Sequence, residues 1–230
     1  MIRTLVMDRS SEDPGVAVFD GDQLLFDRQW DGNPTRAPAW MDDLAIVLRE
    51  HQVSPASIDR FVCGIGPGSF SGIRACLSAL QGMALPGSKP IFGIASAATL
   101  ALQVAAQEGA LVTVIGDARR NRLWCVTYRV FPKEGTLTLA DGGIPKQTAE
   151  DFKLITTDEL SGAIPEGATV VSSDWNRLEE LLRKTVPAER LIDHPCFPKA
   201  RDLGRLSCES KTELCLKEPL PIYLHPAVAK

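Results

Sequence analysis

The chain has 230 residues, and its 25 Lys and Arg against 29 Asp and Glu leave a formal net charge of −4. Nucleic-acid-binding domains that work through bulk charge are usually strongly basic, so this balance argues against that class of protein. The composition, 44% apolar and 23% charged, is that of a globular protein rather than a disordered one. Because no apolar run approaches the roughly 20 residues of a membrane helix, we expect no membrane-spanning segment.

The cysteine and histidine patterns indicate a reducing compartment and no metal site. The six cysteines form no C-x-x-C pair; they are Cys63, Cys76, Cys125, Cys196, Cys208 and Cys215. Several lie in apolar strand-like or helical runs, so we expect buried free thiols rather than disulfides. The opening apolar run meets Asp8 too early for a signal peptide, and we therefore expect a cytoplasmic protein. The histidines form no H-x-x-x-H pair, so we expect no zinc site; they are His51, His194 and His225.

In the first half of the chain, short apolar runs alternate with amphipathic segments. We expect strands over residues 2–7, 16–19, 24–26, 61–65 and 91–94, and helices over residues 39–51, 72–85 and 96–107. Turn signals separate the first three strands closely enough to predict a meander. The second helix carries an apolar stripe at helical spacing, formed by Ile73, Cys76, Leu77, Leu80 and Ala84.

The pattern of the opening then begins again. An apolar run over residues 111–115 leads into Asp117, as the first strand leads into Asp8, and strand-like runs follow at residues 123–128 and 137–139 beyond a polar turn at 118–121. This repetition predicts duplicated α/β lobes. Many prolines interrupt the remainder, where we expect a strand over residues 169–171 and helices over 175–184 and 201–210. We expect a first lobe over residues 1–108 and a looser second lobe over residues 109–230.

The most informative stretch joins the fourth expected strand to the next helix. It reads Gly66, Pro67, Gly68, Ser69, Phe70, Ser71, Gly72, Ile73 and Arg74. Glycines let the backbone approach another group closely, and a helix N-terminus offers unpaired N–H groups and a positive dipole end. The stretch therefore indicates recognition of an anion or a partner, or else a tight strand-to-helix turn with Ser71 as N-cap. It fits neither a Walker A loop, nor G-x-G-x-x-G, nor the G-x-S-x-G of a nucleophile elbow.

Three charged residues near these motifs each have more than one interpretation. Arg74 opposes the helix dipole in the first turn, which indicates a carboxylate partner, capping of loop carbonyls or a bound partner molecule. Asp8 and Asp117 end their strands, where an acidic residue either forms a turn or helps to hold a metal–nucleotide complex. No paired-carboxylate or Ser/His/Asp constellation is visible, so we predict no catalytic residue.

The glycine-rich stretch resembles the G-P-G-S-F-T-G-[LI]-R signature of the bacterial TsaB (YeaZ) family. The opening strand into Asp8 is similar to the family's apolar strand into D-T-S. The segment Asp117-Ala118-Arg119-Arg120 resembles its D-A-R segment, and Pro221-Ile222-Tyr223-Leu224 resembles its closing P-x-Y-L. Two positions depart from the family pattern, since Arg9 stands in place of the usual Thr and Ser71 replaces a Thr while keeping the hydroxyl.

The resemblance implies an α/β fold of two related lobes of the actin/Hsp70/sugar-kinase (ribonuclease H-like) type, with the second lobe reduced. It also implies a non-catalytic partner of TsaD in the synthesis of tRNA threonylcarbamoyladenosine, because TsaD-like proteins carry an H-x-x-x-H metal motif that this chain lacks. ATP and metal are then expected on the TsaD-type partner, and no cofactor is expected on this chain. The chain is expected to contact tRNA only indirectly, through the complex. A TsaE-type ATPase as a further subunit and a homodimer of the isolated chain stay open.

The resemblance further places the partner contacts on the expected helices 39–51 and 72–85. On the second of these, a small-residue surface lies beside the apolar stripe, and it would let another helix approach closely. The expected interface comprises residues 66–74 with Ala75, Ala79 and Met83. Asp8 and Asp117 are expected to form a vestigial nucleotide site at most, because Arg9 replaces a small hydroxyl residue beside the loop.

Two rival functions stay open on the sequence. The first is an ATP-binding kinase or ATPase of the same fold, in which Asp8 and Asp117 would organise Mg–ATP. The second is a glycoprotease-like metallopeptidase, which the missing histidine pair disfavours.

Overall fold

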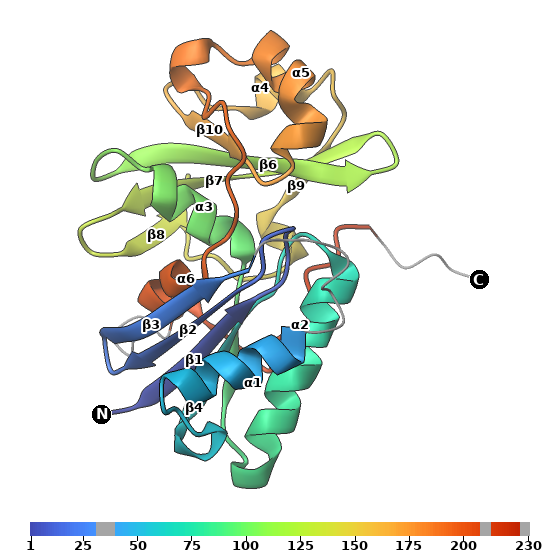
Figure 1. Ribbon diagram of the computed structural model, residues 1–230. Helices are drawn as coiled ribbons and strands as arrows, with labels where there is room; N and C mark the ends of the chain where they lie inside the picture. Colours follow the sequence, from blue (N-terminus) through green and yellow to red (C-terminus); the bar gives the residue numbers. More distant parts are fainter. Residues whose placement is uncertain (31–39, 208–212, 226–230) are drawn as a thin grey trace. The chain divides into compact units, whose positions relative to one another are not determined.

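The structure is a computed structural model that describes residues 1–30, 40–207 and 213–225 (Figure 1). The chain forms two compact units, which we describe separately. The first contains Met1–Ser96 and Pro198–Pro221, and the second contains Ala97–Phe197 and the segment that begins at Ile222. This division differs from a continuous boundary after residue 108, because residues 198–221 belong to the first unit. None of the described helices combines the length and the apolar character needed to cross a membrane.

The first unit is built on a six-stranded mixed sheet with the strand order β11-β5-β4-β1-β2-β3. The strands are β1 Arg3–Asp8, β2 Gly15–Asp20, β3 Gln23–Gln29, β4 Arg60–Gly64, β5 Ile91–Ile94 and β11 Leu216–Lys217. The first three strands form the expected antiparallel meander, and β4 and β5 extend the sheet in parallel from β1. The hairpin between β2 and β3 turns at Gly21, whose φ of 59° suits glycine.

Helices cover both faces of this sheet. They are α1 Trp40–Glu50, α2 Phe70–Ala84 and α6 Ala200–Leu206, with 3-10 turns at Pro55–Ser57 and Leu85–Gly87. The Cys63 side chain of β4 faces Cys76 of α2, with 3.4 Å between the sulfur atoms. Arg60, on the same strand, donates to the Ser207 carbonyl oxygen at the end of α6 over 2.7 Å. Because side chains alternate along a strand, residues 60 and 63 point to opposite faces, so α2 and α6 cover opposite sides of the sheet.

The second unit contains a sheet in which β10, β6, β7 and β8 follow in order and β9 pairs with β7. The strands are β6 Ala110–Arg119, β7 Arg122–Phe131, β8 Thr136–Leu139, β9 Lys153–Ile155 and β10 Thr169–Ser172. The helices are α3 Ser96–Val104, α4 Leu160–Ala163 and α5 Trp175–Thr185, with 3-10 turns at Ala149–Asp151 and Ala188–Arg190. Trp175, Leu178 and Leu182 of α5 pack into a core with apolar residues of β6, β7 and β10.

The two sheets repeat one topology, which confirms the predicted α/β fold of related lobes. In each unit an antiparallel meander is followed by a strand parallel to its first strand: β4 pairs with β1, and β10 pairs with β6. That parallel strand leads into an amphipathic helix, α2 in the first unit and α5 in the second (Figure 1). Each opening strand has an aspartate near its end that accepts from the N–H two residues further on, Asp8 from Ser10 and Asp117 from Arg119, each over 2.7 Å. Asp8 ends β1 as expected, whereas β6 continues two residues beyond Asp117 to Arg119.

Several expected boundaries differ from the structure. The turn of the second meander is shorter than residues 118–121, because β6 continues to Arg119 and leaves a two-residue loop. The helix expected to reach residue 107 ends at Val104. The helix expected over 201–210 ends at Leu206, and residues 208–212 lie outside the described residues, as does the expected helix start at residue 39. The short strands β9 and β11 carry no clear periodicity and were not predicted.

The cysteines follow the expectation of free thiols where the structure describes them. Cys63, Cys76 and Cys125 are buried, Cys196 and Cys215 are half-buried, and none of these five described cysteines is part of a disulfide, whereas Cys208 lies outside the described residues. Burial raises the pKa of the Cys63 thiol, because the thiolate would lose its hydration inside the sheet–helix core. Within residues 1–30, 40–207 and 213–225, no group of three or more His, Cys, Asp or Glu is placed to hold a metal ion.

Candidate functional site

The glycine-rich loop packs directly on the backbone that follows β1. A Cβ atom added at Gly68 would collide with the carbonyl oxygen of Ser10, and one added at Gly72 would collide with the carbonyl oxygen of Arg9. The Ser69 N–H donates to the Ser10 carbonyl oxygen over 2.7 Å, which fixes the same contact. At these two positions the glycines are therefore required by the packing of the chain on itself.

The helix after the loop begins earlier than the sequence suggested. Ser69, not Ser71, is the N-cap of α2, and its hydroxyl accepts from the Gly72 N–H over 3.3 Å. Ser69 has non-helical backbone angles, whereas Ser71 already lies in the first turn with its side chain exposed. The sequence offered two serines at suitable spacing, and only the backbone path decides between them. The expectation that Ser71 caps the helix was wrong.

The outer edge of the loop presents an aromatic ring and a cation. The Phe70 side chain is 51% exposed, and the Arg74 guanidinium lies 5.0 Å from the centre of its ring. Among the described residues Arg74 forms no ion pair, so the cation that opposes the helix dipole is stabilised by the ring and by water. Both groups are therefore accessible to a partner molecule.

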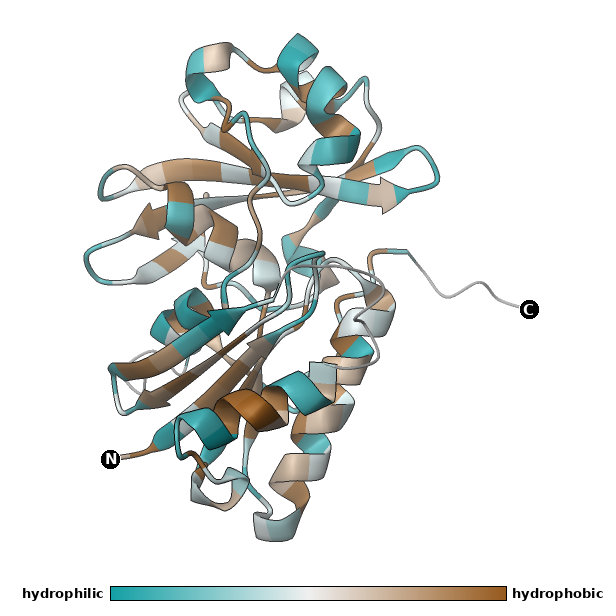
Figure 2. Ribbon diagram, in the orientation of Figure 1, coloured by the Kyte–Doolittle hydropathy of each residue, from teal (hydrophilic) through white to brown (hydrophobic). Residues whose placement is uncertain are grey.

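The two faces of α2 match the sequence prediction. The five residues of the apolar stripe are all buried. Beside them Ala75, Ala79 and Met83 are half-buried and Gly82 is exposed, with no atom within 4 Å of a Cβ added there. Arg74 is the only charged residue of α2. Figure 2 shows the helix mostly in pale to brown colours, with few hydrophilic bands. This outer face is unusually free of charge for a solvent-exposed helix.

The other helix expected at the interface, α1, also exposes apolar side chains. Met41 and Ile46 are 42% and 46% exposed, while Leu44 and Val47 are buried on its inner side. The Arg9 guanidinium lies 4.3 Å from the centre of the Trp40 ring, and partial burial lowers the pKa of Arg9. Arg9, which stands in place of the usual Thr of the family, thus contacts Trp40, the first residue of α1. No sequence pattern indicated this contact.

Asp8, one of the two expected nucleotide-site residues, is enclosed in the first unit. The residue is 0% exposed, and its Oδ1 atom accepts from the N–H and the hydroxyl of Ser10 over 2.7 and 2.6 Å. A Cβ atom at Gly64 would collide with the carboxylate. Burial raises the pKa of Asp8, because the cost of removing the carboxylate from water outweighs the hydrogen bonds from Ser10 and Ser96. This geometry favours a structural role over a contact with Mg–ATP.

The Asp8 environment predicts a stabilising substitution. A carboxyl whose pKa is raised on folding destabilises the folded chain increasingly as the pH rises from the unfolded pKa through the folded one. In Asp8→Asn the amide oxygen can still accept from Ser10, and no charge is buried. We expect this variant to unfold at higher urea concentration than the parent at pH 7, with a gap that narrows as the pH falls through the raised pKa of Asp8 toward about 4 and no longer changes below that pH. Asp22→Asn, at an exposed carboxyl, is the control; lower stability of Asp8→Asn at pH 7 would show that the buried charge is needed.

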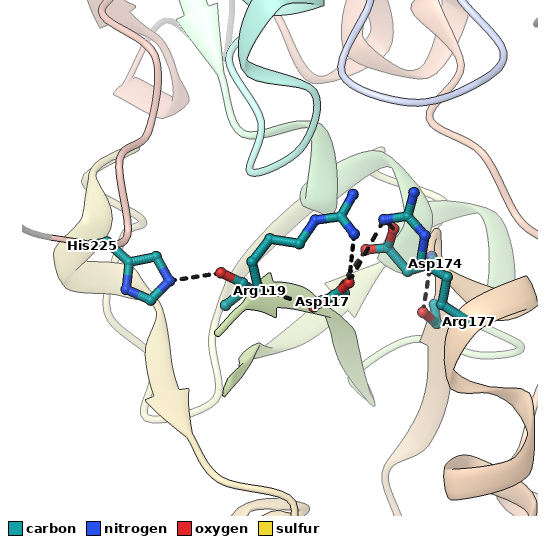
Figure 3. Close-up of polar contacts among 7 residues, drawn as sticks. Asp117, Arg119, Asp174, Arg177 and His225 are labelled. Carbon is teal, nitrogen blue, oxygen red and sulfur yellow. Dashed lines mark hydrogen bonds and ion pairs between the residues drawn. The ribbon is translucent and has the colours of Figure 1, made fainter. Parts of the chain in front are cut away.

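Asp117, the second expected nucleotide-site residue, lies in the second unit. Its carboxylate contacts the guanidinium groups of Arg119 and Arg177, with oxygen–nitrogen distances of 3.2 and 3.6 Å (Figure 3). Asp174 completes the cluster, because its Oδ2 atom accepts from the Asp117 N–H over 2.9 Å. Burial raises the pKa of Asp174. Asp174 and Arg177 were not predicted as site residues, because they come close to Asp117 only when β10 pairs with β6.

Two solved structures have the same arrangement of elements. One is described as a crystal structure of an uncharacterized protein with similarity to peptidase YeaZ from Pseudomonas aeruginosa; it is 22% identical, with a TM-score of 0.74, covering 98% of this chain and 100% of that chain. YeaZ from Pseudomonas aeruginosa is 21% identical, with a TM-score of 0.69, covering 91% of this chain and 95% of that chain. The fold therefore defines a protein of the YeaZ fold, with two α/β units of related topology.

Comparison of sequences narrows this class to one family. A family described as "TsaD: tRNA N6-adenosine threonylcarbamoyltransferase" matches residues 40–143. The tRNA threonylcarbamoyladenosine biosynthesis protein TsaB of Escherichia coli (strain K12) is 31% identical over 192 residues, which cover 80% of this chain and 78% of that protein. The chain belongs to the TsaB family, as the signature of its glycine-rich loop indicated.

Proposed function

We propose that the chain is a non-catalytic subunit that binds and activates a TsaD-type enzyme in the synthesis of tRNA threonylcarbamoyladenosine. In this proposal the partner carries ATP and metal and transfers a threonylcarbamoyl group to the adenosine 3′ of the anticodon in the cytoplasm. The name of the Escherichia coli relative supports the pathway. The missing H-x-x-x-H motif and the enclosed carboxylate of Asp8 support a non-catalytic role.

The single observation that carries the proposed partner contact is that the outer sides of α1 and α2 expose apolar side chains and that α2 carries only one charged residue, Arg74. Protein interfaces are depleted in charge at their centre and enriched in aromatic residues, Met and Arg. On these two helices Phe70, Arg74, Met41 and Ile46 are exposed, and α2 adds its small residues. Small side chains permit close approach of a helix from the partner, and the exposed ring and guanidinium provide anchors. The same face would serve a homodimer of the isolated chain, and a TsaE-type ATPase would join through other surfaces.

Reconstitution of the transfer reaction tests the proposal. A TsaD-type enzyme is assayed with threonylcarbamoyl-adenylate and an unmodified tRNA, with and without this chain. We expect modified adenosine to form only when both proteins are present, and no product from this chain alone. Full activity of the TsaD-type enzyme without this chain would refute the activating role. Modified tRNA or cleaved protein produced by this chain alone would refute the non-catalytic role.

A further inference from the structure

The tip of the β6–β7 hairpin in the second unit gathers four arginines. Arg119, Arg120 and Arg122 lie at the tip, and Arg177 lies in the first turns of α5. The Arg119 and Arg177 side chains are 64% and 46% exposed, and the other two residues are also exposed. A chain with a net charge of −4 thus carries a concentrated positive surface, which we call the arginine hairpin.

Carboxylates hold part of this surface in a fixed position. The Asp117 carboxylate accepts from the Arg119 N–H over 2.7 Å and contacts the guanidinium groups of Arg119 and Arg177. Asp174 holds the Asp117 backbone and lies 4.0 Å from Arg177. Figure 3 shows both arginine side chains directed toward the two carboxylates. Each guanidinium has five N–H donors, so these contacts leave donors free for a further ligand.

A second contact fixes the hairpin from the other side. A ring nitrogen of His225 lies 2.6 Å from the carbonyl oxygen of Ala118 (Figure 3). Ala118 lies where the pairing register of β6 and β7 shifts, between Asp117 and Arg119. Such a bulge redirects the side chains that follow it. The arginine hairpin is therefore held by its own unit before any ligand binds.

Local rules of hairpin stability are broken at this tip. The register places Arg119 directly opposite Arg122, and like charges in such a pair repel. Arg119, Arg120 and Asn121 have φ angles of 65°, 54° and 56°, which glycine or asparagine adopts more readily than arginine. Unfavourable backbone and charge arrangements that the surroundings enforce tend to occur at functional sites.

The positive charge of the arginine hairpin exceeds the negative charge around it. Asp117 and Asp174 neutralise two of the four guanidinium groups. Within the described part of the chain Arg120 forms no ion pair. Glu159 accepts from the N–H and the hydroxyl of Thr156 over 2.8 and 3.0 Å, and these hydrogen bonds, together with the more distant charge of Arg122, lower the pKa of Glu159. None of the exposed large hydrophobic residues lies between Asp117 and Arg122. A surface of planar forked cations fits phosphate groups, to which a guanidinium can donate two parallel hydrogen bonds.

We propose that the arginine hairpin binds the phosphate backbone of the tRNA during modification, an inference that rests on the proposed function. The chain would then contact the substrate directly, although its net charge argues against a bulk-charge nucleic-acid binder. Each phosphate neutralised by an arginine adds to the salt dependence of RNA binding. The contact supplies affinity without sequence readout, because phosphates are common to all tRNAs.

The test uses the double variant Arg120→Glu/Arg122→Glu, which leaves the Asp117 ion pairs in place. The control, Arg28→Glu/Lys184→Glu, makes the same charge change at two other exposed residues that form no ion pair among the described ones. The probe is an unmodified tRNA transcript, titrated by fluorescence anisotropy against the complex with a TsaD-type enzyme at several salt concentrations. We expect the hairpin variant to bind roughly tenfold or more weakly, with a salt slope smaller by about 2, and the control to resemble the parent.

Capture of the TsaD-type enzyme by each variant is measured in parallel. A hairpin variant that captures the enzyme but binds tRNA as the parent does, with the same salt slope, overturns the proposal. Loss of enzyme capture by that variant alone also overturns it, because the hairpin would then bind protein. If the parent itself captures no TsaD-type enzyme, the proposed function fails, and the titration is repeated with the chain alone. Equal binding of tRNA by parent and hairpin variant in that titration, or none by either, overturns the hairpin proposal separately.

Discussion

An arginine at position 79 is expected to leave the chain folded and to abolish its capture of a TsaD-type enzyme. Ala79 is half-buried on the outer side of α2, where the long stem of an arginine can carry its guanidinium into water in the free chain. In a close helix–helix contact the same group would be removed from water without a partner, at a cost of about 3 kcal/mol or more, which lowers the affinity at least roughly a hundredfold.

Circular dichroism, thermal melting and a pull-down of the partner enzyme check this expectation together. Ser161→Arg provides the matched control, because it adds the same charge at an exposed position of α4 in the second unit. Unfolding of Ala79→Arg would assign the face to the core of the chain itself. A folded variant that still captures the enzyme would place the interface elsewhere.

The same substitution at two glycines of α2 is expected to change stability in opposite directions. In Gly72→Ala the new methyl group meets the carbonyl oxygen of Arg9, a backbone atom that cannot move without shifting the end of β1. We expect a loss of about 3 kcal/mol in the free energy of unfolding. In Gly82→Ala the methyl group meets open space, and the higher helix propensity of alanine should add about 0.5 to 1 kcal/mol.

Urea unfolding of both variants measures the difference, and each serves as the control for the other because helix propensity changes equally. Equal stability of Gly72→Ala and Gly82→Ala would mean that the loop does not pack on residues 9 and 10. Gly82→Ala has a second use, since a methyl group on the small-residue surface should weaken capture of the partner while the chain itself becomes more stable. Unchanged capture would exclude close helix approach at that position.

The sequence by itself determined the order of elements and the relation between the two halves. Short apolar runs separated by polar turns are typical of a meander, so β1 to β3 and β6 to β8 were predictable from local pattern. The stripe of α2 was equally predictable, because all five of its residues repeat at the helical period and all five are buried. The glycine-rich loop identified the family, since its nine residues are specific and local.

Only the tertiary structure decided what individual polar residues do. Asp8 reads as a surface turn residue or as a ligand, and it is neither exposed nor free, because β4 places Gly64 against its carboxylate. Ser69 rather than Ser71 caps α2, because the loop packs on Ser10 and gives Ser69 the backbone conformation of an N-cap residue. The cluster around Asp117 forms only because β10 pairs with β6. The first unit includes residues 198–221, which follow the second unit in the sequence. The periodicity of apolar residues shows which side of a helix or strand is buried, but it does not show what packs against that side. The contacts above join residues far apart in the chain, and they depend on which elements pack together.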